Sequence, residues 1–130
     1  MSRFDKYDPV SGGFRAPLLA AIAAANVGKV QAVAINTSGK VIIGGAAETA
    51  IIGLICPVRP MAINDVIDVM THGEIVEATT TGGVAFTAGA LVYAHADGTI
   101  DNTATAGKIV GKLIELTRIV VRCPIPSTVA

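Results

Sequence analysis

The sequence has few aromatic residues, few charges and no long apolar run. Trp is absent, Phe and Tyr contribute only three and two residues, and charged residues make up 15% of the 130 positions. The net charge is zero, and Lys and Arg are scattered without interleaved aromatics, so nothing predicts a nucleic-acid-binding surface. The longest apolar runs, residues 16–25 and 50–58, are shorter than the roughly 20 residues of a membrane span. We therefore expect neither a nucleic-acid nor a membrane partner.

Residues suited to catalysis or metal binding are equally sparse. His72 and Glu74, and likewise His95 and Asp97, are spaced so that a strand would place them on one face. Each pair adjoins a glycine in a predicted turn, however, where polar residues are expected for structural reasons. The chain also lacks a Gly-x-Ser-x-Gly elbow and a phosphate-binding loop. We predict that the protein is not an enzyme and holds neither a metal nor another cofactor.

What the sequence does contain is aliphatic. Hydrophobic residues make up 52% of the chain, so the core would consist of Val, Ile, Leu and Ala. So small a charge content leaves apolar surface for another subunit to cover, and we expect a homo-oligomer. Cys56 and Cys123 fit either two buried thiols or a disulfide, and their spacing does not decide between these.

Short apolar runs separated by Gly, Pro, Asn and Asp predict an all-β fold, either a small compact β-barrel or a β-sandwich. The expected strands are residues 30–35, 41–43, 51–56, 66–70, 74–77, 91–94, 99–101, 109–115 and 118–122.

Three hairpins are expected among these strands. Asp97-Gly98 between two apolar runs is a strong hairpin signal, and only two residues separate the last two strands. A third hairpin is expected around His72 and Gly73, joining residues 66–70 to residues 74–77. We place this β domain at residues 30–130.

Residues 1–29 are expected to form an N-terminal arm followed by a short helix. Residues 16–26 are rich in Ala and Leu, with Pro17 in a position suited to a first helical turn. Residues 1–15 hold five of the twenty charges and three of the five aromatics in a Gly- and Pro-containing segment. Such a segment is either a free tail or an arm that docks on a partner, and we favour the arm. Its docking residues would be Arg3, Phe4, Tyr7, Phe14 and Arg15.

A cleaved signal peptide is the other interpretation of this end. The charges of Asp5 and Asp8, together with Pro17, do not fit one, and the chain begins at Met1. We therefore expect an unprocessed product made in the cytoplasm.

The order of motifs from residue 64 onward resembles the capsid decoration (cement) proteins of tailed bacteriophages. That family has a G-D-x-V-x-V hairpin, an A-G-x-x-V-Y strand, a D-G or N-G turn, a T-x-T-A linker and a V-G strand. In this sequence Asn64 stands where the first of these motifs commonly has glycine. The corresponding segments are residues 64–69, 72–77, 86–93, 97–100, 103–107, 109–111 and 120–122.

This resemblance implies a structural protein of the virion, made in the host cytoplasm and bound to the capsid exterior. Its partner would be the major capsid protein, which it would reinforce as a trimer with an N-terminal docking arm. The alternatives are a secreted or surface β-rich binding module, which Met1 disfavours, and a small enzyme with a site between subunits, which no motif supports.

Overall fold

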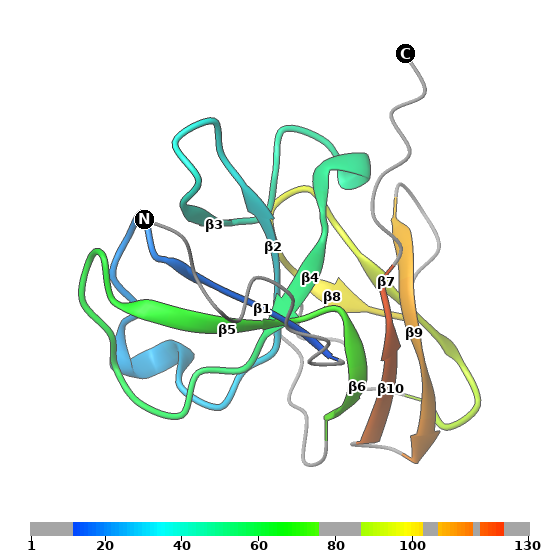
Figure 1. The fold of residues 1–130 in the computed structure, drawn as a ribbon. Helices are drawn as coiled ribbons and strands as arrows, with labels where there is room; N and C mark the ends of the chain where they lie inside the picture. The colour runs from blue at the N-terminus through cyan, green and yellow to red at the C-terminus, as the bar shows by residue number, and fades with distance from the viewer. Residues whose placement is uncertain (1–11, 76–86, 103–106, 116–117, 124–130) are drawn as a thin grey trace, which may run out of the picture.

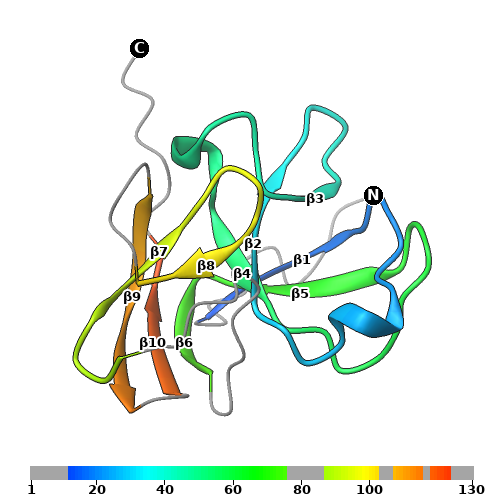
Figure 2. The same cartoon turned by 180° about the vertical axis from the view of Figure 1, so that it is seen from behind.

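The protein folds into two five-stranded antiparallel sheets that lie side by side, as both views of the chain show (Figures 1 and 2). The computed structural model describes residues 12–75, 87–102, 107–115 and 118–123. In spatial order the first sheet contains β1 (Gly13–Pro17), β5 (Val66–Met70), β4 (Gly53–Ile55), β2 (Gln31–Ile35) and β3 (Val41–Ile43). The second contains β6 (His72–Ile75), β10 (Arg118–Arg122), β9 (Lys108–Glu115), β7 (Leu91–Ala94) and β8 (Ile100–Asp101). The all-β prediction is therefore confirmed, in its sandwich form.

The main core lies between the two sheets. Because side chains alternate along a strand, Ile119 and Val121 of β10 point into it while Val120 points away. The first sheet contributes Ala32 and Leu54, both fully buried. Aliphatic side chains fill this space, as the composition predicts.

The first sheet buries its other face as well, around a second apolar cluster. Val33 of β2 and Ile55 of β4 point into this cluster, away from the second sheet. The chain after β1 covers it, because Leu18 pairs in parallel with Val41 and the Leu19 N–H donates to the Val41 carbonyl at 3.0 Å. Since β1 and β3 are the two edges of this sheet, that contact curls the sheet around the cluster.

A backbone joint, formed by Ala32, Gly44, Gly45, Ala96 and Gly98, fastens the two sheets together. The loop between β7 and β8 reaches the first sheet, where the Ala32 N–H donates to the Gly98 carbonyl at 2.8 Å. The Gly44 N–H donates to Ala32 at 2.8 Å, and the Gly45 N–H donates to Ala96 at 2.9 Å. Figure 2 shows this loop against the end of β2.

Two of the three expected hairpins form. β9 and β10 pair directly, and β7 pairs with β8 across the Asp97-Gly98 turn. That turn is longer than the tight two-residue form. The His95 N–H donates to the Thr99 carbonyl, and only Gly98 has a positive φ, +91°.

The third expected hairpin, around His72 and Gly73, is wrong. β5 pairs with β1 and β4 in the first sheet, whereas β6 pairs with β10 in the second. The chain changes sheets at Thr71, whose N–H donates to the Gly12 carbonyl instead of extending a hairpin ladder. Two adjacent apolar runs therefore belong to different sheets, a choice that their local pattern does not encode.

The helix expected over residues 16–26 is also wrong, and a 3₁₀ turn, η1 (Ala24–Asn26), is all that forms there. A second 3₁₀ turn, η2 (Glu48–Ala50), precedes β4. Residues 18–22 are not helical because Leu18 and Leu19 bond to β3 and Ile22 bonds to Met61, and these tertiary contacts outweigh the helix propensity of Ala and Leu. β1, which lies before the expected division at residue 29, pairs with β5 in the first sheet.

Candidate docking surfaces

Two of the five expected docking residues lie within the described part of the chain. Arg3, Phe4 and Tyr7 lie outside the described residues. Phe14 and Arg15 lie in β1, and as neighbours on a strand they point to opposite faces. The structure therefore separates these two residues.

Each of these two residues already has a partner within its own chain. Phe14 packs against the second apolar cluster, and the Arg15 Nε donates to Asp68 Oδ1 at 2.6 Å. Pairing with β5 makes β1 part of the first sheet, and contact of Phe14 and Arg15 with a partner protein stays a prediction. The arm can extend no further than residue 12.

Both terminal segments join the folded body at Thr71. The Gly12 carbonyl accepts hydrogen bonds from the N–H groups of Thr71 at 2.7 Å and His72 at 3.2 Å. At the other end of the chain, the Cys123 N–H donates to the Thr71 carbonyl at 2.9 Å. Residues 1–11 and 124–130 therefore start from one place, where the chain passes between the sheets.

The second sheet has an exposed outer face that carries apolar side chains. Leu91 and Ile109 are 39% and 48% exposed, although each is next to a residue buried in the core. The strand register aligns Leu91 with Lys112 and Lys112 with Val120, and it aligns Ile109 with Tyr93. We use "outer face" for Leu91, Tyr93, Ile109, Lys112, Val120 and Arg122.

Two β-bulges in β9 determine which residues reach this face. The pairing with β7 moves from Gly111 to Ile109 and skips Val110. The pairing with β10 moves from Glu115 to Leu113 and skips Ile114. A bulge places one extra residue on a strand and resets its alternation, so Ile109 and Lys112 share a face although three positions separate them.

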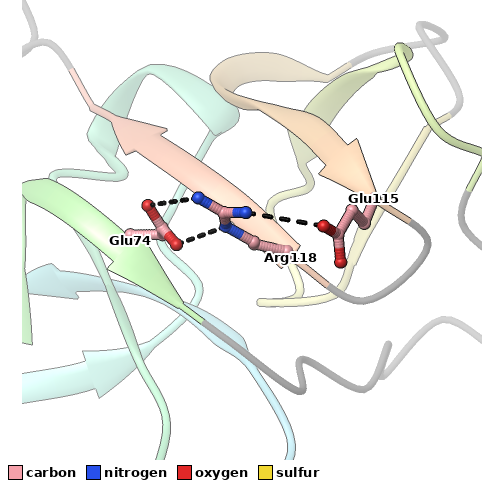
Figure 3. Close-up of polar contacts among 3 residues, drawn as sticks. All are labelled: Glu74, Glu115 and Arg118. Atoms are coloured by element: carbon pink, nitrogen blue, oxygen red, sulfur yellow. Dashed lines mark hydrogen bonds and ion pairs between the residues drawn. The ribbon is translucent and has the colours of Figure 1, made fainter.

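The cations on the outer face and beside it differ in whether they pair with a carboxylate. Within the described part of the chain, neither Lys112 nor Arg122 pairs with a carboxylate, and one Arg122 Nη donates to the carbonyl of the adjacent Val121. Arg118, near the end of the same face, contacts the Glu74 carboxylate with two nitrogens and Glu115 with a third (Figure 3). Hydrogen bonding to Glu74 raises the pKa of Arg118 above its ordinary value, so this cation stays charged and paired.

A further polar pair closes the β8 side of this face. His95 Nε2 lies 2.7 Å from Asp101 Oδ1, and both side chains are largely buried. The pair links the loop after β7 to β8 and leaves the rim of the face with engaged carboxylates. The middle of the face thus has the unpaired cations, and the edges have the anions.

The first sheet has a smaller exposed group, Leu19, Ile63 and Val66. Ile63 lies in a tight turn, where the Asp65 N–H donates to the Ala62 carbonyl and the Asp65 carboxylate accepts from the Ala62 N–H. Asn64 has a φ of +70°, a conformation that Asn tolerates better than most residues. Glycine would also adopt this backbone conformation readily.

The described residues offer little for small ligands or metals. A shallow groove between residues 18–20 and β3 is lined only by apolar residues, without converging polar groups to orient a ligand. No cluster of three or more His, Cys, Asp or Glu occurs within the described ranges. Among those residues, no helix is long and apolar enough to cross a bilayer.

The cysteines are both free thiols. Burial raises the pKa of Cys56 and of Cys123, which keeps them protonated and weakly reactive. Burial also lowers the pKa of Lys108, whose Nζ donates to the Ile51 carbonyl at 2.5 Å. These groups fit structural roles in the core.

Comparison with known proteins identifies the fold but not a family. No known family and no curated protein matches the sequence. A solved structure from Mycobacterium phage Patience is similar in fold, with a TM-score of 0.76 and 20% sequence identity. The match covers 95% of this chain and 96% of that one. The chain therefore has, over nearly its whole length, the fold of a phage protein.

Proposed function

We propose that this protein is a structural component of a tailed-phage virion that binds the exterior of the assembled capsid and stabilises the shell. The observation that carries this proposal is the end-to-end match with a phage protein of the same size. The order of motifs from residue 64 onward supports a decoration protein among phage structural proteins.

The physical mechanism is linkage. A protein that binds the assembled lattice, and not its free subunits, stabilises the lattice by the free energy of binding. Stabilising the lattice in this way requires a contact surface and does not require a chemical reaction. The outer face and the group at Leu19, Ile63 and Val66 provide exposed apolar area for a shell and for neighbouring copies.

The N-terminal segment supplies a further contact in this proposal. Phe4 and Tyr7 could each contribute about 1.5–3 kcal/mol when buried on a partner. Ordering the segment opposes this by about 1–2 kcal/mol per residue, so the arm gains only where several contacts form together. Because Gly12 is held at Thr71, the arm begins at a fixed point of the body.

Deletion of residues 1–11 tests the arm. We expect the truncated protein to keep its circular dichroism and its oligomeric state and to bind empty shells of the source phage at least tenfold more weakly. The matched control is deletion of residues 124–130, which also begin at Thr71. Unchanged binding after loss of residues 1–11 would remove the arm from the proposal.

Phe4→Ala and Phe14→Ala separate docking from folding. Phe14 packs on the second cluster, so its truncation should lower the free energy of unfolding by about 1–3 kcal/mol. Phe4→Ala should leave stability within about 0.5 kcal/mol and weaken shell binding.

Sedimentation of the full chain tests the expected trimer, which a stable monomer at micromolar concentration would contradict.

A further inference from the structure

The outer face of the second sheet combines exposed apolar side chains with two cations that lack a carboxylate partner among the described residues. Two neighbouring interior strands, β9 and β10, carry Lys112 and Arg122, which pair with no carboxylate in the described residues. Exposed Leu91 and Ile109, with half-buried Tyr93 and Val120, lie around these cations. Apolar and aromatic side chains around a central Arg are the composition of protein–protein contacts with high binding energy.

We propose that the outer face docks on an apolar protein surface whose carboxylates pair with Lys112 and Arg122. The identity of that partner as the assembled shell rests on the proposed function. The two cations are diagonal neighbours on adjacent strands, because Lys112 is aligned with Val120 and Arg122 lies two residues further along. One acidic segment of the partner could therefore contact both.

A second copy of this chain bound through the same face does not fit the charge distribution. A two-fold axis through the middle of the face would bring Lys112 and Arg122 close to the same cations of the other copy. Like charges brought together at an interface oppose association. The partner must therefore supply the negative charge.

The rim of the face disfavours a polyanion such as nucleic acid. Glu74 and Glu115 at one end and Asp101 at the other keep carboxylates close to the cations. A chain of phosphates that crossed the face would pass these carboxylates, whereas a protein can place a carboxylate at the centre alone.

The size of the face indicates how the contact is used. The five strands contain 4, 5, 8, 4 and 2 residues, and at about 3.3 Å per residue and about 4.8 Å between strands they cover roughly 360 Å². A stable pair of proteins usually buries about 800 Å² on each partner. One face alone would bind weakly, and repetition on a lattice would make the attachment strong through multivalency.

Charge reversal tests the proposal in the full-length protein. Lys112→Glu and Arg122→Glu would each be measured for binding to empty shells of the source phage that lack this protein. Lys40→Glu is the matched control, because Lys40 lies in the β2–β3 turn of the other sheet. We expect each outer-face variant to bind about tenfold more weakly or worse and the control to bind like the wild type. Raising the salt concentration should weaken the wild type more than either variant.

The possible results distinguish a wrong docking surface from a wrong proposed function. If the wild type binds shells and both reversals bind equally well, the outer face is not the docking surface and the proposed function stands. If the wild type does not bind shells, the proposed function and this partner both fail. Circular dichroism and oligomeric state, measured for every variant, distinguish lost binding from lost folding.

An apolar variant provides an independent test of the same face. Ile109→Asp places a charge on the outer face and should weaken shell binding by about tenfold or more. Val58→Asp is its control, since Val58 is 88% exposed in a loop outside this sheet. Equal binding by the two variants would overturn the proposal.

Discussion

The two sheets have the same number of strands and use their apolar residues differently. The first buries apolar residues on both faces, one set against the second sheet and one around the cluster that includes Val33 and Ile55, although Val66 of β5 stays exposed. The second buries one face and leaves Leu91 and Ile109 exposed on the other. The exposed apolar residues of the first sheet, Leu19, Ile63 and Val66, lie in loops or at the start of β5. The second sheet therefore has the more continuous exposed apolar face.

The connections of the two sheets follow the same division. The first sheet is curled by the contact between Leu18 and Val41, which links its two edges. The second sheet is fastened to it by the joint at Gly44 and Gly98 and by the crossing at Thr71. Its outer face is thereby held in place by the first sheet, which reduces the conformational entropy that this face itself loses on binding a partner.

Gly44→Ala should have the largest effect, because it breaks the joint between the sheets. Gly44 has a φ of +73°, and a methyl group there would collide with the Ala96 carbonyl oxygen. Left-handed strain of about 1–2 kcal/mol and overpacking of about 1–3 kcal/mol together predict a loss of about 2–5 kcal/mol. Urea denaturation measures this loss.

Gly39→Ala is the control for that prediction. Gly39 has a similar φ of +79°, with nothing close to the position a methyl group would take. Its loss should be limited to the strain of about 1–2 kcal/mol. Equal losses for the two variants would show that the joint contributes nothing to stability.

Ile55→Ala and Ile109→Ala compare the faces that the two sheets turn away from each other. Ile55 is 1% exposed in the second cluster, so its truncation should lower the free energy of unfolding by about 2–5 kcal/mol. Ile109 is on the outer face, and its truncation should change stability by no more than about 0.5 kcal/mol. A large loss at Ile109 would mean that the outer face contributes to the fold instead of remaining available to a partner.

Local sequence patterns predicted most of the strands, because a short strand or a tight turn depends mainly on residues that are neighbours in sequence. The Asp97-Gly98 turn and the run that forms β2 are examples, and both require only neighbouring residues. The helix over residues 16–26 was wrong because contacts with Val41 and Met61, distant in sequence, keep that segment extended. The third hairpin failed for the same kind of reason, since the bonds of Thr71 to Gly12 and Cys123 direct the chain into the other sheet.

The outer face could not have been predicted from alternation alone. Residues 109–114 are nearly all apolar, and bulges at Val110 and Ile114 change which of them point outward. The only sequence signal for this face was Lys112, a charged residue among the apolar residues in the middle of β9. Phe14, an aromatic residue beside glycines that suggested an arm, lies in β1 and packs against the second cluster, which its local sequence did not indicate.

The smallest expected effect concerns one turn in each sheet. Asn36 and Asp97 accept similar backbone hydrogen bonds in these two turns, and of the two side chains only Asp97 is ionisable. In the first sheet the Asn36 Oδ1 accepts hydrogen bonds from the N–H groups of Ser38 and Lys40, both at 2.9 Å. In the second, Asp97 Oδ1 accepts from the Thr99 hydroxyl at 2.7 Å and the Thr99 N–H at 3.0 Å. These hydrogen bonds lower the pKa of Asp97 below its ordinary value, with the Thr99 hydroxyl as the largest cause.

A lowered folded-state pKa means that Asp97 stabilises the fold above the ordinary aspartate pKa of about 3.9. That contribution is lost as the pH falls through the lower pKa of the folded state. Because Asp97 is exposed, solvent screening keeps the contribution below about 1 kcal/mol at pH 7. Asp97→Asn gives this turn the neutral side chain that the first sheet already uses, so the stability difference between wild type and variant should shrink between pH 6 and about pH 2.5. Chemical denaturation across this range measures the difference, with Asn36→Ser as a variant whose deficit should not depend on pH. A constant difference for Asp97→Asn would show that hydrogen bonding in this turn is indifferent to the charge of Asp97.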